Sequence, residues 1–222
     1  KRCSLLRLDL HIHTRFSKDS QAPIPSLVER CRKAGLGMVA ITDHDSIRGA
    51  LEVRSLAPFP VIVGEEITSA AGHLIGLFLR EEVQGGLAAL DTVRRVKEQG
   101  GLVVVPHPFC RLRPSALGLR ALRDILPFVD LIEGYNSHTL LPGDNARAVA
   151  FAEKHSLPMV ACSDAHSALE LGRTFTEVPE GELDGTPEGL VRAVKAGRMV
   201  GKRPNPLLLM APGLARFRKV LA

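Results

Sequence analysis

Two histidines at the end of an apolar run are the first residues of this 222-residue chain that could do chemistry. They are His11 and His13, which follow Leu8, Asp9 and Leu10. Alternate residues of an extended segment point the same way, so two imidazoles at the end of a strand can bind one cation. Histidine pairs also occur on solvated strand faces, so the rest of the sequence must decide between these interpretations.

Further apolar runs also end in side chains that bind metals. Run 37–42 is followed by Asp43, His44 and Asp45, and run 60–64 by Glu65 and Glu66. Run 102–106 is followed by His107, and run 129–132 leads to Asn136 and His138. Run 158–162 is followed by Asp164 and His166. Short β-branched runs without alternation are typical of strands buried on both faces of a parallel sheet. Because sites of α/β folds form at the carboxyl ends of such strands, we expect these donors to share one site.

Segments with helical periodicity separate these runs. They cover 25–34, 86–99, 144–155 and 187–196, and 74–79 is expected to be a further strand near an edge of the sheet. Strand and helix therefore alternate about seven times, without an internal repeat. This order predicts one α/β domain over 1–222, either a barrel or a doubly wound sheet. The tail containing Pro204, Pro206 and Pro212 is expected to form a closing strand or loop and a short basic helix.

Composition restricts the partners and the compartment. A net charge of +5 favours an anionic partner, but the basic residues are scattered, as on solvated helix faces. One tyrosine and no tryptophan disfavour a long nucleic-acid partner. The chain has no apolar run that could span a membrane and no recognisable signal peptide. Four cysteines without Cys-x-x-Cys spacing predict buried, reduced thiols in a cytoplasmic protein, whereas the oligomeric state is not predicted.

The order of the motifs resembles the PHP (polymerase and histidinol phosphatase) superfamily. The motifs are His11-x-His13, Asp19 within 14–20, 42–45, 64–68, His107-Pro108 and 163–166. The resemblance runs from about 8 to about 178, with a C-terminal helix and tail over about 186–222, and the stretch 171–177 resembles the ending of stand-alone bacterial members. It implies an α/β fold of PHP type, a single-domain distorted (β/α)7 TIM-like barrel, and the hydrolysis of phosphate esters.

The resemblance also implies three metal positions. His11, His13, Glu66 and Asp164 would hold the first; Glu66, His107 and His138 the second, bridged by Glu66; and Asp19, His44 and His166 the third. Imidazole and carboxylate donors suit manganese, zinc or iron, and we expect two to three divalent ions. The family glutamate follows a Gly-x pattern, which selects Glu66 over Glu65. Glu133 and Asn136 remain alternatives to His138, and either Asp43 or Asp45 could orient His44 through its second ring nitrogen.

The implied activity is metal-dependent hydrolysis of a small phosphomonoester such as a nucleotide, a bisphosphate nucleotide or histidinol phosphate. The metals held by Glu66 and Asp164 would activate a water to hydroxide, and Arg111 is the first choice to meet the phosphoryl charge. Substrate contacts are also expected from Arg15, Arg173, Asn136 and His73. The alternatives are a 3′–5′ exonuclease on short oligonucleotides and a non-catalytic, metal-stabilised binding domain.

Overall fold

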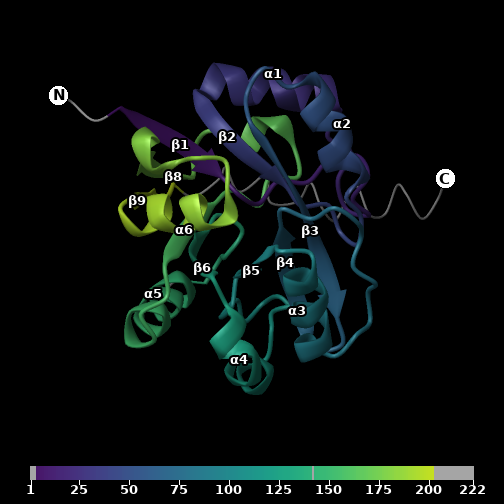
Figure 1. Cartoon of the computed structure of the whole chain (residues 1–222), viewed down its shortest axis with the longest axis vertical. Coiled ribbons are helices and arrows are strands. Elements are labelled where there is room, and N and C mark those ends of the chain that lie inside the picture. The colour runs from purple at the N-terminus through teal and green to yellow at the C-terminus, as the bar shows by residue number, and fades with distance from the viewer. Residues whose placement is uncertain (1–3, 142, 203–222) are drawn as a thin grey trace.

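Strands and helices alternate along the chain in the computed structural model, which describes residues 4–141 and 143–202 (Figure 1). The strands form one sheet and are β1 (Leu5–Asp9), β2 (Leu36–Ile41), β3 (Val61–Ser69), β4 (Gly72–Leu77), β5 (Leu102–Val105), β6 (Leu131–Asn136), β7 (Met159–Cys162), β8 (Phe175–Pro179) and β9 (Arg198–Val200). The helices are α1 (Ile24–Ala34), α2 (Arg48–Leu56), α3 (Ala89–Glu98), α4 (Leu119–Ile125), α5 (Asp144–Lys154) and α6 (Pro187–Lys195). Short 3-10 turns cover Leu126–Phe128, Ala168–Glu170 and Glu180–Glu182.

The order of the strands in the sheet is β7-β6-β5-β4-β3-β2-β1-β8-β9. Strand β4 is antiparallel to β3 and β5, and β8 is antiparallel to β1 and β9, whereas the other neighbours are parallel. The prediction that the strand at 74–79 lies near an edge is wrong. Only Ala70 and Ala71 separate β3 from β4, and so short a connection can make only an antiparallel hairpin.

Two contacts bring the ends of the sheet together into a nearly closed barrel. Beyond the ends of β1 and β7, the backbone N–H of His13 donates to the carbonyl of Ala165 at 2.9 Å. Lower in the barrel, the Thr176 hydroxyl of β8 accepts from the N–H of Ala161 in β7 at 2.9 Å and donates to its carbonyl at 3.3 Å. The fold is therefore the expected barrel-like α/β domain, in which one threonine side chain replaces a ladder of backbone bonds.

The sheet separates two apolar clusters. Alternate residues of the strands, such as Leu8, Ala40 and Ile62, point inward and pack with Leu190 of α6. Residues on the other face pack under the remaining helices and include Leu27, Val39, Val53, Val93, Leu122 and Ala152. Because the strands are buried on both faces, they lack the alternation of an exposed sheet, as the sequence predicts.

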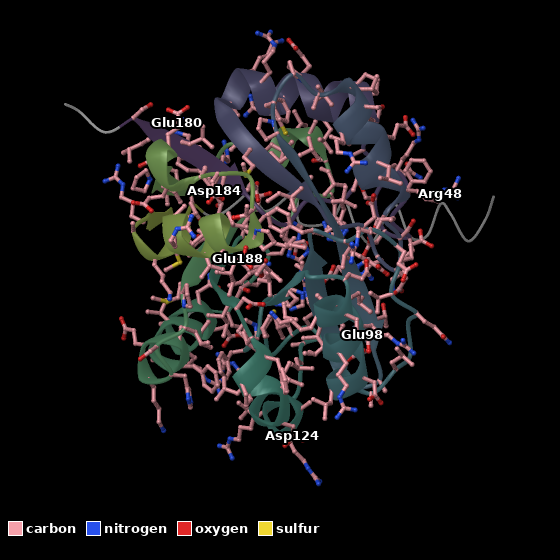
Figure 2. The ribbon with its side chains drawn as sticks, in the orientation of Figure 1. Arg48, Glu98, Asp124, Glu180, Asp184 and Glu188 are labelled. Carbon is pink, nitrogen blue, oxygen red and sulfur yellow. The ribbon has the colours of Figure 1, made fainter. Side chains whose placement is uncertain are left out.

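The helices at 25–34, 86–99, 144–155 and 187–196 are confirmed, with ends that differ by a few residues. Helices α2 and α4 were not predicted. Charged side chains of the helices lie outward: Figure 2 shows Arg48 at the start of α2 and Asp124 in α4 at the periphery. Basic and acidic side chains pair on the helix surfaces, as Arg94 does with Asp91 at 3.0 Å.

Cys31, Cys110 and Cys162 are buried free thiols, as expected. No helix among the described residues is long and apolar enough to cross a bilayer. The tail beyond Lys202, including its expected basic helix, lies outside the described residues.

The closure of the barrel generates the first prediction. Thr176→Val keeps the shape of the side chain but leaves the N–H and C=O of Ala161 without this partner, so the free energy of unfolding should fall by about 1–3 kcal/mol. Urea denaturation followed by circular dichroism measures the change. Thr92→Val is the matched control, because the Ala88 carbonyl that its hydroxyl contacts also accepts the N–H of Thr92. Equal losses in the two variants would contradict this account of closure.

Candidate metal centre

One carboxylate oxygen, Oε2 of Glu66, lies among the donors predicted for the first metal. It is 3.3 Å from Nε2 of His11 and 3.3 Å from Nε2 of His13, and these two nitrogens are 3.0 Å apart. Oδ1 of Asp164 lies 3.4 and 3.3 Å from the same two nitrogens. All four side chains are buried, and Oδ1 of Asp164 has no hydrogen-bond partner. The structure therefore brings together the four residues expected at this position.

The other oxygen of Glu66, Oε1, faces a different pair of imidazoles. It lies 3.0 Å from Nε2 of His107 and 2.8 Å from Nδ1 of His73. Glu66 is paired with Ile75 across the β3–β4 hairpin, so His73, two residues earlier, is its diagonal neighbour. His73, expected to contact substrate, is thus placed as a candidate ligand.

His138 lies elsewhere, although the resemblance assigned it to the set of Glu66 and His107. Its Nε2 contacts Oε2 of Glu170 at 2.5 Å, and its ring lies 5.3 Å from that of His166. Glu170 also accepts the backbone N–H of His166, at 3.3 Å. The geometry therefore favours His73 over His138 beside His107, and makes His138 a neighbour of the third set.

The third predicted set surrounds Asp19. Its Oδ2 lies 3.1 Å from Nε2 of His44, and its Oδ1 lies 3.4 Å from Nε2 of His166. Ligand atoms of these three residues and of His13 lie within 4.8 Å of one another. His44 also presents Nδ1 to Oε2 of Glu66 at 3.4 Å. The three sets are therefore continuous, with Glu66 and His44 between them.

These donors fit divalent cations. Nδ1 of His44 and Oδ1 of Asp164 are buried without a hydrogen-bond partner, and each is directed at neighbouring ligand atoms. An unpartnered buried polar atom is costly, and a cation shared with its neighbours removes that cost. Imidazole nitrogens with carboxylate oxygens suit manganese, zinc or iron.

The charged groups of the centre shift the pKa values of their neighbours in the opposite direction to burial. Burial raises the pKa of Glu66, but the charges of His44, His11 and His73 outweigh it and hold this pKa well below its usual value. Burial lowers the pKa of His13, but Asp164 and Glu66 outweigh it and raise this pKa to about 10. A cation that binds His13 must therefore displace a proton.

Two of the candidate ligands have a strained backbone. His107 and Asp164 have φ angles of 32° and 54°, in or near the left-handed region that side chains with a Cβ rarely adopt. Such conformations cost about 1–3 kcal/mol each and persist where the surroundings hold them. Here they turn each side chain from the end of a strand into the centre.

Glu133 orients His11 rather than adding to the donor sets. Its Oε1 contacts Nδ1 of His11 at 2.7 Å, and its Oε2 accepts from the N–H of His107 and from Nδ2 of Asn136, both at 2.8 Å. This arrangement leaves Nε2 of His11 facing Glu66. Asn136 is likewise occupied, because Nδ2 also contacts Asp164 at 3.2 Å.

The expectation that Asp43 or Asp45 orients His44 is wrong. Asp43 accepts from the N–H of Thr14 at 2.6 Å and from its hydroxyl at 2.7 Å. Asp45 makes the same pair of contacts to Thr68, at 2.7 and 2.8 Å. Both aspartates therefore fix neighbouring backbone, and Asp43 holds the start of the loop that carries Asp19.

Arg113, which the sequence did not single out, contacts the donor sets. Its Nη1 lies 2.7 Å from Oδ2 of Asp164, and its side chain is 23% exposed, so it lies between the centre and solvent. Arg111 instead directs Nε to Oδ1 of Asp144 at 2.7 Å. The sequence shows that both arginines follow His107 in one loop, but their spacing alone does not show which of them contacts the donor sets.

The other two arginines expected to bind substrate lie farther out. Arg15 pairs with Glu52 at 2.8 Å and stacks on Phe16. Arg173 lines a surface groove with Arg7 and Lys202. Their contact with substrate, like that of Arg111, stays a prediction.

A buried set of histidines and carboxylates at the carboxyl ends of parallel strands defines a candidate metal-binding α/β barrel. Family models agree: the PHP domain matches residues 9–99, and the PHP-associated region matches residues 142–199. The chain belongs to the PHP family.

Two uncharacterized proteins of Methanocaldococcus jannaschii are similar in sequence. One is 36% identical over 144 residues, which cover 59% of this chain and 84% of the relative. The other is 34% identical over 178 residues, which cover 79% of this chain and 71% of the relative. A two-domain protein of Bacteroides vulgatus, described as containing a predicted PHP-like metal-dependent phosphoesterase, has the same fold. The match has a TM-score of 0.71 at 22% identity and covers 96% of this chain and 70% of the other.

The two adjacent glutamates test the centre. Glu66→Gln should lower metal affinity at least about tenfold, because it removes the charge that two donor sets share. Glu65→Gln is the matched control. Burial raises the Glu65 pKa to about 8, so its carboxyl is mostly neutral at pH 7. Its Oε2 accepts the N–H of Val83 at 2.8 Å. Metal content after equilibrium dialysis measures both. A larger loss in Glu65→Gln would contradict the assignment.

Proposed function

We propose that this protein is a metal-dependent phosphoesterase that hydrolyses small phosphomonoesters. The observation that carries the proposal is the Glu66 carboxylate, which lies among five imidazoles while Arg113 contacts Asp164 at the solvent side. When bound, two to three divalent cations such as manganese, zinc or iron supply a water of lowered pKa and positive charge for the phosphoryl oxygens.

The residues of the chain hold and orient the reactants. Glu66 and Asp164 keep their negative charge in a buried site, where this charge offsets the positive charge of bound cations. Arg113 has five N–H donors in a planar fork, and only Nη1 is directed at Asp164. The donors that remain suit a non-bridging phosphoryl oxygen, whose charge grows in the transition state.

Two observations support a small substrate. Most of the donor residues are buried, whereas Asp19, His44 and Arg113 are partly exposed, so a reacting phosphoryl group should enter from their side. The chain is also poor in the aromatic residues on which successive bases of a long single strand would stack. Donors in all three sets, with His73 beside Glu66, favour catalysis over a purely structural metal site.

A phosphate-release screen tests the proposal. Protein supplied with manganese, zinc or iron should release phosphate from mononucleotides, nucleotide bisphosphates and sugar phosphates faster than it cleaves diesters, because only a monoester presents a terminal dianion to the centre and Arg113. Chelation should abolish the activity, and the same metal should restore it. Preferred, stepwise shortening of an oligonucleotide would instead favour the exonuclease, and binding of metal without turnover of any ester would favour the non-catalytic domain.

The two arginines after His107 test how the phosphoryl group is bound. Arg113→Met should lower kcat/KM for a phosphomonoester about 10- to 100-fold, because charge-assisted hydrogen bonds are lost in both the ground and transition states. Arg111→Met should cost much less, since Nε of Arg111 is held by Asp144. Assays at saturating metal separate this effect from weaker metal binding by Asp164, which Arg113 contacts. The opposite ranking would restore Arg111 to the role predicted from the sequence.

A further inference from the structure

Three exposed leucines lie on three successive loops at the carboxyl ends of the strands. Leu112 follows β5, Leu140 follows β6 and Leu169 follows β7, and they are 59%, 47% and 67% exposed. A single exposed leucine needs no explanation, whereas exposed apolar residues on neighbouring loops beside a site are a feature of binding surfaces. We call these three residues the leucine rim.

Contacts between the loops place the leucine rim around one mouth. Strands β5, β6 and β7 are parallel neighbours, so their following loops emerge side by side. Arg111, next to Leu112, bonds to Asp144 just beyond the β6 loop. His138 in the β6 loop bonds to Glu170, next to Leu169.

The leucine rim borders the metal centre. Arg113 follows Leu112 directly and contacts Asp164, while His138, two residues before Leu140, lies against His166. A molecule held at the centre by an anionic group would therefore extend past the rim as it leaves the barrel. The mouth is charged at its base and carries three exposed leucines on its edge, which complements a molecule with an anionic end and an apolar end.

We propose that the leucine rim binds the leaving group, so that the preferred substrates are phosphomonoesters of apolar alcohols. This proposal rests on the proposed phosphoesterase function and specifies its substrate class. The phosphoryl group fits the cations and Arg113, whereas the alkyl or aryl group loses water against leucine. A sugar or another strongly hydrated leaving group gains nothing from such a surface.

A series of n-alkyl phosphates from ethyl to hexyl tests the proposal. For the wild-type protein, kcat/KM should rise about two- to fourfold with each methylene group until the chain passes the rim. In the triple variant Leu112→Ser, Leu140→Ser, Leu169→Ser, this dependence should flatten. Metal content and circular dichroism should match the wild type, which shows that the centre and the fold persist.

Leu56→Ser is the matched control. Leu56 is 55% exposed, but it ends α2 shortly before β3 begins, at the opposite end of the strands from the rim. This variant should keep both the activity and the chain-length dependence of the wild type. A flattened dependence in Leu56→Ser would overturn the assignment to the rim.

Binding of n-alkyl phosphonates, which are not hydrolysed, separates this proposal from the proposed function. Calorimetry should show affinity that rises with chain length in the wild type and not in the triple variant, even if no ester is turned over. Equal affinity along the series, or preference for glycerol phosphate over hexyl phosphate in turnover, overturns the proposal. A wild-type dimer that the triple variant dissociates, with the chain-length dependence intact, would also overturn it and make the rim an interface between copies.

Discussion

The burial of the Glu66 carboxylate is the constraint on which the rest of the structure depends. A charge away from water costs several kcal/mol unless it is paired, and Glu66 is paired with imidazoles from five separate positions in the sequence. Each imidazole must therefore arrive with the correct register. A one-residue slip in any strand would turn its donor to the opposite face and leave the carboxylate incompletely paired.

The barrel meets this requirement because its strands end together. Strands that run in the same direction bring His11, His44 and His107 to one mouth, while the β3–β4 hairpin adds His73 from an antiparallel strand. Loops alone would hold these side chains less firmly, and the structure compensates with carboxylates: Asp43 fixes Thr14, and Glu133 fixes His11. The polar groups around the centre thus form a network whose members hold one another in place.

The sequence was sufficient for features that depend on local spacing. His-x-His at a strand end and buried strands without alternation follow from the two-residue period of extended chain. The choice of Glu66 over Glu65 came instead from the resemblance to the PHP family. Pairing across the sheet is not encoded locally, so the position of β4 and the approach of His73 to Glu66 could not be predicted. Arg111 and Arg113 share a loop without regular structure, where no period shows which side chain turns inward.

The site has a buried base and an outer edge made of loops. This division explains how one centre can serve different substrates. The inner apolar cluster lies below the ligands and excludes water from their base, which strengthens every charge interaction there. Under the proposed function, that part of the site recognises only a phosphoryl group and cations, which are common to many esters. Discrimination between leaving groups must therefore come from the loops beyond the strands, because only they reach the rest of the substrate. In this chain three of those loops present a leucine to solvent, and a leucine offers a leaving group apolar contact but no hydrogen bond.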